Sequence, residues 1–328
     1  MKAIVYEKYG SPDVLALKEV EKPSPKENEI LIKVHAASLN RGDLPTLRGK
    51  PFLFRLMNGL RGPKHNILGD DIAGTVEAVG SNVTQFQPGD EVFGMSNFGA
   101  FAEYRCVTEY NEPHQSMILK PASLSFEEAA AIPIAAITAL QGLRDKGQIQ
   151  SGQSVLINGA SGGVGTFAVQ IAKHFGAEVT GVCSTNKMDM VRSIGADHVI
   201  DYLEEDFTKS GEQYDLILDV AAYRSIFNYK QSLSSNGIYV CTGGSTGRFF
   251  QAMFFGPLVS LRGNKKLGSA GIAKPTQEDF LYLIELFEAG KVVPVIDRSY
   301  PLSEVAEALQ YLEEGKAQGK VVITVAKE

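Results

Sequence analysis

The chain lacks most of what a disulfide framework, a zinc site, a nucleic-acid surface or a membrane span requires. Its three cysteines, Cys106, Cys183 and Cys241, have no disulfide or zinc spacing, which fits a reducing compartment. No long block of Lys and Arg is present and the formal charge is −6, so nucleic acid is not an expected partner. The longest apolar run, 129–140, contains Pro133 and is too short for stable membrane insertion. A β-prone start without a secretory leader predicts a cytoplasmic protein.

Two domains are expected from the length of 328 residues and the 44% hydrophobic content. Residues 1–124 are rich in short β-prone runs that Gly, Pro and Asn separate. The expected strands are 3–6, 29–37, 72–79, 90–93 and 101–107. From Ser125, followed by a carboxylate at the third helical position, the pattern changes to a long helix toward Lys146.

Beyond this helix, strands and helical segments alternate, as a doubly wound parallel sheet requires. The expected strands are 154–158, 178–183, 198–200, 215–220 and 237–242. We therefore predict an α/β chain with a nucleotide-binding domain at 125–265. The remainder, 266–328, contains an expected helix at 277–289 and a strand at 321–325, and completes the β-rich domain of 1–124.

A glycine-rich turn between a strand and the helix expected at 163–175 is the most informative feature. Its residues are Ala160, Ser161, Gly162, Gly163, Val164 and Gly165, which match the dinucleotide motif G-x-G-x-x-G except that Ala160 replaces the first glycine. Such glycines let the backbone approach a pyrophosphate, and the amides and dipole of the helix N-terminus favour the anion. The alternative is an ordinary glycine-rich loop.

Two other enzyme classes use a similar turn. Ser161 fits the G-x-S-x-G elbow of hydrolases, but only His174 and His198 follow it, so a downstream catalytic histidine is missing. A short-chain dehydrogenase needs this turn near the N-terminus and a Tyr-x-x-x-Lys pair. None of the 12 tyrosines has a lysine four residues later. The pattern favours a nucleotide domain that follows another domain.

Five sequence blocks together resemble the medium-chain dehydrogenase/reductase superfamily, in its zinc-free branch of quinone oxidoreductases and enone (alkenal) reductases. The blocks are 37–43 (ASLNRGD), 69–76 (GDDIAGTV), 88–92 (PGDEV), the turn at 160–165 and 319–322 (GKVV). The resemblance implies a GroES-like catalytic domain followed by a Rossmann domain. Zinc-dependent members carry a cysteine where this chain has Asn40, and a histidine before an acid where it has Asp70-Asp71. Oxygen donors alone do not build the usual tetrahedral zinc site, so no metal is expected.

NADPH is the expected cofactor. About 20 residues past the turn, where NAD-specific sheets place an acid, this chain has Ser184. Hydroxyl groups and a cation suit the 2′-phosphate of NADPH, which an aspartate would repel. By resemblance, Lys187 and Tyr202 touch this phosphate; the alternative for Lys187 is a solvated surface lysine.

A metal-free reductase favours quinones or α,β-unsaturated carbonyls, because these delocalise the charge that hydride transfer creates. Asn40 is the first candidate for a hydrogen-bond donor near the acceptor carbonyl, and Asp43 for a residue that orients the loop. By resemblance, the Asn40 carboxamide faces either the nicotinamide ribose or the substrate; a further alternative for Asn40 is a turn residue. By resemblance, Thr138, Gly243 and Gly244 flank the nicotinamide, and Lys320 approaches it. Pro45 stands about where relatives have a tyrosine suspected of donating the proton, so the proton donor stays open.

Two apolar segments, 51–57 and 249–255, contain more large side chains than loops need. We expect Phe52, Phe54 and Phe254 to line a pocket for an apolar enone or quinone, with a subunit interface or plain core as alternatives. The predicted protein is an NADPH-dependent reductase, expected as a homodimer from the resemblance. An enoyl-thioester reductase and a crystallin-like or redox-sensing NADPH-binding protein remain alternatives.

Overall fold

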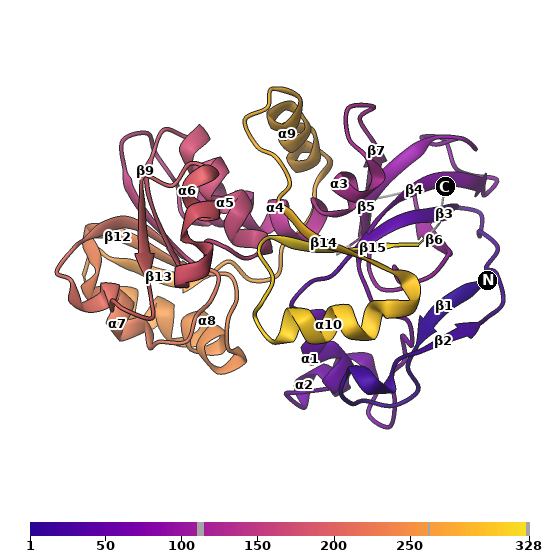
Figure 1. Ribbon diagram of the computed structural model, residues 1–328, viewed down its shortest axis with the longest axis horizontal. Coiled ribbons are helices and arrows are strands. Elements are labelled where there is room, and N and C mark those ends of the chain that lie inside the picture. The colour runs from indigo at the N-terminus through magenta and orange to yellow at the C-terminus, as the bar shows by residue number, and fades with distance from the viewer. Residues whose placement is uncertain (110–114, 262, 326–328) are drawn as a thin grey trace. The chain divides into compact units, whose positions relative to one another are not determined.

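The computed structural model describes residues 1–109, 115–261 and 263–325 (Figure 1). The chain forms two compact units. Unit 1 comprises Met1–Ile134, Lys274–Ile284 and Ile296–Glu328, and unit 2 comprises Ala135–Ala273 and Glu285–Val295.

Unit 1 is built on a mainly antiparallel, seven-stranded sheet. Its strands are β3 (Glu29–Ser38), β4 (Asp71–Val79), β5 (Glu91–Ser96), β6 (Tyr104–Thr108), β7 (Gln115–Leu119), β14 (Ile296–Pro301) and β15 (Lys320–Thr324). They follow the order β14-β15-β3-β4-β5-β7, and β6 also pairs with β3. A separate hairpin joins β1 (Lys2–Val5) to β2 (Ala16–Glu19).

The register of this sheet brings three strand ends together. Ser38, the last residue of β3, lies opposite Asp71, the first residue of β4. Ser38 also lies opposite Val322 of β15, which begins at Lys320. Short helices in the same unit are α1 (Asp43–Arg48), α2 (Leu53–Asn58), α3 (Phe126–Ala130) and α10 (Val305–Glu313), and α9 (Gln277–Glu288) begins in it.

The helix predicted from Ser125 to Lys146 begins where expected but is not continuous. The Ser125 hydroxyl accepts a hydrogen bond from the Glu128 amide, and the Glu128 carboxylate accepts one from the Ser125 amide, which confirms the N-terminal cap. Prediction of a single helix was wrong, because α3 stops before Pro133, which has no N–H and disfavours helical backbone in the residue before it. Pro133 begins α4 (Pro133–Leu140), which continues into a π-helical turn over Gln141–Lys146.

Unit 2 contains a parallel sheet of six strands, which confirms the expected doubly wound architecture. The strands are β8 (Ser154–Asn158), β9 (Glu178–Cys183), β10 (His198–Asp201), β11 (Tyr214–Asp219), β12 (Leu233–Cys241) and β13 (Lys266–Ser269). Their order is β10-β9-β8-β11-β12-β13. Figure 1 shows α5 (Gly163–His174) and α6 (Met188–Ser193) on one side of the sheet, and α7 (Ile226–Gln231) and α8 (Thr246–Ser260) on the other.

The units do not divide where the sequence predicted. Residues 266–273 belong to unit 2, because β13 pairs with β12 in the register Ile238 to Lys266. Residues 285–295 return to unit 2 as well, where the Gln170 side chain bonds both the amide and the carbonyl of Val293 at 2.9 Å. At the first boundary the units divide after Ile134 rather than after residue 124.

Candidate functional site

A fully buried carboxylate, Asp71, occupies the corner where β3, β4 and β15 meet in unit 1. Its Oδ2 accepts hydrogen bonds from the Ser38 hydroxyl at 3.0 Å and from the Asn40 side-chain nitrogen at 2.9 Å. Its Oδ1 accepts a bond from the Ile134 amide at 3.0 Å. A buried charge needs such partners, since desolvation is costly. Asp71 is therefore the acceptor at the centre of this cluster.

The counter-charge of Asp71 is the ammonium group of Lys320, only 2% exposed. Nζ lies 3.3 Å from Asp71 Oδ2, 2.8 Å from the Asn40 side-chain oxygen and 3.0 Å from the Leu39 carbonyl. These three acceptors match the three N–H donors of a lysine. The predicted approach of Lys320 to the nicotinamide stays a prediction, while all three of these acceptors lie within unit 1.

Asn40 and Asp43 are joined by a tight local turn. The Asn40 amide donates to Asp43 Oδ2 at 2.7 Å, and the Asp43 amide donates to the Asn40 carbonyl at 3.0 Å. Burial raises the pKa of Asp43 to about 8, and the carboxylates of Asp70 and Asp71 act in the same direction. Asp43 and the backbone of Asn40 are therefore joined by two hydrogen bonds, and the orienting role of Asp43 stays a prediction.

The donor set of this corner does not fit a zinc ion. Asn40 and Asp71 share the Lys320 ammonium, so a divalent cation beside them would lie next to a buried positive charge. The neighbouring Asp70 side chain accepts a hydrogen bond from the Phe98 amide at 2.6 Å. Among the residues that the structure describes, no group of three or more His, Cys, Asp or Glu could hold a metal.

The glycine-rich turn of unit 2 is a backbone-lined cradle at the N-terminus of α5. Gly159 has φ +85°, and a Cβ on Gly165 would lie 2.1 Å from the Gly159 carbonyl oxygen, so the helix packs directly on the turn. The first N–H groups of a helix have no acceptor within it, and the first turn of α5 has no acidic residue to compete for them. The turn predicted at 160–165 thus has the geometry for binding an anion.

Beneath this turn lies a second buried carboxylate, Asp219, which the sequence did not single out. It accepts hydrogen bonds from the Asn158 side chain and the Tyr239 hydroxyl, both at 2.8 Å, and from the Ala221 amide at 3.2 Å. Burial raises the pKa of Asp219 to about 6, although these donors oppose the shift. Asp219 ties the ends of β8, β11 and β12 together at the edge where the turn lies.

The residues predicted to recognise a 2′-phosphate follow β9 and β10. Ser184 donates its hydroxyl to the Asn186 side chain at 2.9 Å. Tyr202 is half exposed, whereas Lys187 is only 7% exposed, so the alternative of a solvated surface lysine is wrong. β10 pairs with β9 as far as Asp201 opposite Cys183, which places these residues at one end of the sheet.

The remaining predicted residues divide between the units. Thr138 is half-buried on α4, and Gly243 and Gly244 follow β12 and precede α8, all in unit 2. Phe254 lies on α8, is 62% exposed and stacks on Phe250 with ring centroids 6.0 Å apart. Phe52 and Phe54 belong to unit 1, and the exposure of Phe52 and Phe254 rules out plain core for these two side chains.

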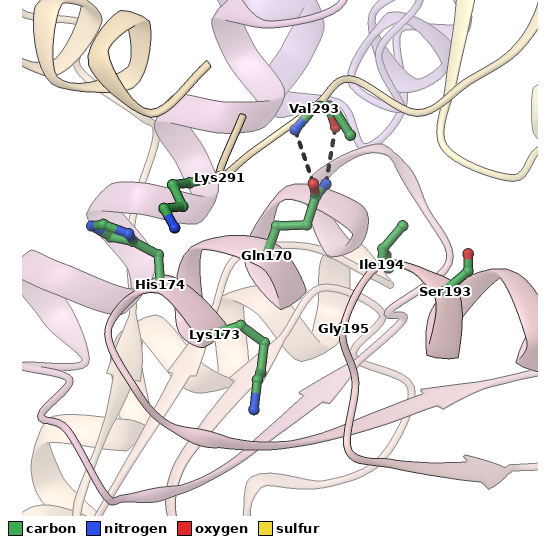
Figure 2. A pocket seen from close by; sticks show the side chains of 8 residues that line it. All are labelled: Gln170, Lys173, His174, Ser193, Ile194, Gly195, Lys291 and Val293. Carbon is green, nitrogen blue, oxygen red and sulfur yellow. Dashed lines mark hydrogen bonds between the residues drawn. The ribbon is translucent and has the colours of Figure 1, made fainter. Parts of the chain in front are cut away.

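Two hollows of unit 2 are lined by residues outside the glycine turn. One of about 470 Å³ lies at the C-terminal end of α5, beside Lys173, His174 and Lys291 (Figure 2). The glycine turn lies at the opposite end of the same helix. A second hollow of about 390 Å³ runs along α8 and is lined by Phe250, Phe254 and Phe255 together with polar side chains.

Comparisons with known proteins identify the domains and relatives of this chain. Residues 26–116 match the alcohol dehydrogenase GroES-like domain, and residues 194–323 match a domain described as zinc-binding dehydrogenase. A 2-methylene-furan-3-one reductase from Solanum lycopersicum is 39% identical, over 98% of this chain and 79% of its own length. A chloroplastic NADPH-dependent alkenal/one oxidoreductase from Arabidopsis thaliana is 35% identical over the same shares.

The fold has a close match among solved structures. The quinone oxidoreductase from Coxiella burnetii superimposes with a TM-score of 0.88 at 32% identity, over 99% of both chains. In the part of the chain that the structure describes, no helix is both long and apolar enough to cross a membrane. The GroES-like and Rossmann-type architecture predicted from the sequence is confirmed.

Proposed function

Because the chain belongs to the medium-chain dehydrogenase/reductase superfamily, in the branch of quinone oxidoreductases and alkenal/one oxidoreductases, we propose that it reduces activated C=C bonds or quinones with NADPH. The single observation that carries the proposal is the Asn40 carboxamide, held between Asp71 and Lys320 where a zinc-dependent enzyme would present metal ligands. A neutral amide donor suits an acceptor that delocalises its own charge.

Bound NADPH supplies the hydride. The protein's part is to hold both reactants and to stabilise the charge that appears on the acceptor oxygen. The Asn40 side-chain nitrogen carries two hydrogens, one of which is directed at Asp71, and the other is the donor for the enolate or hydroquinone oxygen. Asp43 fixes the backbone of Asn40.

The cradle of unit 2 would hold the cofactor. The turn residues 160–165 and the first amides of α5 suit the pyrophosphate, and Ser184, Lys187 and Tyr202 suit the 2′-phosphate. Thr138, Gly243 and Gly244 would contact the nicotinamide. The absence of an acid at position 184 supports NADPH over NADH.

Three further parts of the proposal concern metal, substrate and assembly. The enzyme works without zinc, since a buried ammonium already occupies the acceptors at Asn40 and Asp71. Phe254 contacts the apolar part of the acceptor, which the phenylalanine-lined hollow along α8 supports, and Phe52 and Phe54 of unit 1 stay predicted pocket residues. The protein is a homodimer of the cytoplasm.

The test is oxidation of NADPH in the presence of enones, alkenals, quinones and enoyl-CoA, with NADH and a chelator as controls. Turnover of enones or quinones that the chelator does not reduce is expected. Loss of activity with chelator would contradict the metal-free mechanism, and exclusive use of enoyl-CoA would make the chain an enoyl-thioester reductase. Tight NADPH binding without turnover of any acceptor would indicate a binding or sensing protein.

A substitution at Asn40 tests the proposed donor. Asn40→Ala is expected to lower kcat about 100-fold, the usual effect of removing one oxyanion donor. Asn66→Ala, which removes another asparagine of unit 1, is the control and should leave kcat within a factor of two. An Asn40→Ala enzyme with unchanged kcat would exclude Asn40 from the reaction.

A further inference from the structure

The orientation of the Asn40 carboxamide is fixed from both ends. An ammonium group can only donate hydrogen bonds, and Lys320 Nζ lies 2.8 Å from one end of the amide. A carboxylate can only accept, and Asp71 Oδ2 lies 2.9 Å from the other end. Flipping the amide would place its oxygen against the carboxylate and its NH₂ against the ammonium. Only one orientation satisfies both partners.

Lys320 is also placed to make the Asn40 side-chain N–H a stronger hydrogen-bond donor. A cation bonded to a carboxamide oxygen draws electron density from the attached nitrogen, and hydrogen bonds linked in this way strengthen one another. The same ammonium balances Asp71, whose negative charge would otherwise oppose charge on a nearby acceptor oxygen. Both effects depend on the position of one buried nitrogen atom.

We propose that Lys320 is a positioning residue, which fixes and polarises the Asn40 carboxamide so that its remaining N–H faces the acceptor oxygen. This inference rests on the proposed function of Asn40. It differs from the role expected for Lys320 by resemblance, in which the lysine approaches the nicotinamide. A positioning residue alters kcat, whereas a cofactor-binding residue alters the affinity for NADPH.

The test compares the wild type with Lys320→Met and with the double variant Lys320→Met/Asp71→Asn. The single variant leaves the Asp71 carboxylate buried without its cation, which destabilises the fold, whereas the double variant removes both charges together. In the double variant we expect kcat to fall about 10- to 100-fold, and to fall below the kcat of Asp71→Asn alone, which keeps Lys320. The Kd for NADPH, measured by fluorescence titration, should stay within threefold of the wild type.

The matched control is Lys120→Met. Lys120 is the other deeply buried lysine with a carboxylate partner described in unit 1; its side chain is 4% exposed and its ammonium lies 2.9 Å from Glu91. Loss of this lysine should alter stability and leave kcat within a factor of two. An equal fall of kcat in Lys120→Met and in the double variant would indicate a general structural effect and overturn the proposal.

A spectroscopic measurement tests the positioning independently of turnover. In protein labelled with ¹⁵N-asparagine, the side-chain signals of Asn40 are identified by their loss in Asn40→Ala. We expect the double variant to shift these signals toward those of exposed asparagines and to accelerate exchange of the amide hydrogens. Unchanged Asn40 signals, or an unchanged kcat, would overturn the role of Lys320. If the wild type shows no turnover but the Asn40 signals still shift in the double variant, the proposed function is overturned, whereas the positioning of Asn40 by Lys320 stands.

Discussion

The two units build their candidate sites from different chemical groups. Unit 1 uses buried side chains, with the Asp71 carboxylate and the Lys320 ammonium 3.3 Å apart at a corner of its sheet. Unit 2 uses backbone, because its cradle consists of the turn before α5 and the N–H groups of that helix. Even the buried acid of unit 2, Asp219, is held by neutral donors rather than by a cation. A site of charges is sensitive to substitutions that alter charge, whereas a backbone site is sensitive to added atoms.

The largest expected effect is on the charged site. Asp71→Asn leaves the Lys320 ammonium buried without its counter-charge, so the free energy of unfolding should fall by about 3–5 kcal/mol. Chemical denaturation measures this. The control is Glu91→Gln, which removes the carboxylate partner of buried Lys120 but leaves that lysine its carbonyl acceptors at Pro121 and Leu124. If both variants lost the same free energy of unfolding, Asp71 would be no more important to its lysine than Glu91 is to Lys120.

The backbone site should respond to a single methyl group. A Cβ at Gly165 would lie 2.1 Å from the Gly159 oxygen, so Gly165→Ala should force α5 away from the turn. We expect a loss of about 1–3 kcal/mol in stability and at least tenfold weaker NADPH binding. Gly268→Ala in β13 of the same unit is the matched control, because an added Cβ there meets no atom within 4 Å. Similar NADPH affinities of the two variants would remove the argument for close packing.

Cofactor preference tests whether unit 2 also uses a charge. Ser184→Asp places a carboxylate where the 2′-phosphate is proposed, which should lower the ratio of kcat/KM for NADPH over NADH about tenfold or more. Steady-state kinetics with both cofactors measure the ratio. Ser184→Asn, similar in size and uncharged, should retain the preference for NADPH. If aspartate and asparagine gave the same ratio, position 184 would not contact the phosphate.

The finest comparison is the pH dependence of the two units. A carboxyl whose pKa is raised in the folded state binds its proton more tightly there, so stability falls as pH rises between the unfolded and the folded pKa. The folded pKa is about 8 for Asp43 and about 6 for Asp219. Relative to the wild type, Asp219→Asn should therefore gain stability from about pH 4 to pH 6 and Asp43→Asn up to about pH 8, by at most about 1.4 kcal/mol per pH unit. Urea unfolding across this range measures the stability difference between each variant and the wild type. If both differences stopped increasing at the same pH, the expected separation of the two pKa values would be contradicted.

The difference between a backbone site and a side-chain site also explains what the sequence could predict. The cradle was visible because a strand, a glycine turn and a helix are contiguous, and strands such as β8 and β9 lie at the predicted residues. The helix beginning at Ser125 was predicted with its cap but not with its break at Pro133. Strand β13 was missed because four residues, with two small ones among them, give too short a β pattern.

The charged corner of unit 1 could not be assembled from sequence. Asn40 and Asp43 were identified, and they are near neighbours in the chain. Asp71 was noted only because zinc-dependent members have a histidine and an acid at Asp70-Asp71, and its complete burial reveals another role. Its partner Lys320 is 249 residues away, and pairing through β3 brings the two together. No local pattern encodes a contact of this kind, and the same holds for the buried network of Asp219, where Tyr239 is 20 residues away.

The late position of Lys320 has a consequence for biosynthesis. Asp71, Ser38 and Asn40 leave the ribosome long before β15, so the N-terminal part of unit 1 exists for hundreds of residues of translation with an acid that has no counter-ion. The corner closes only when the last strand of the sheet adds its lysine. Unit 2, apart from residues 285–295, is complete by residue 273 and is free to fold earlier. Activity should therefore appear abruptly once β15 has been synthesised, and nascent chains that stall before β15 should be targets for chaperones or proteases.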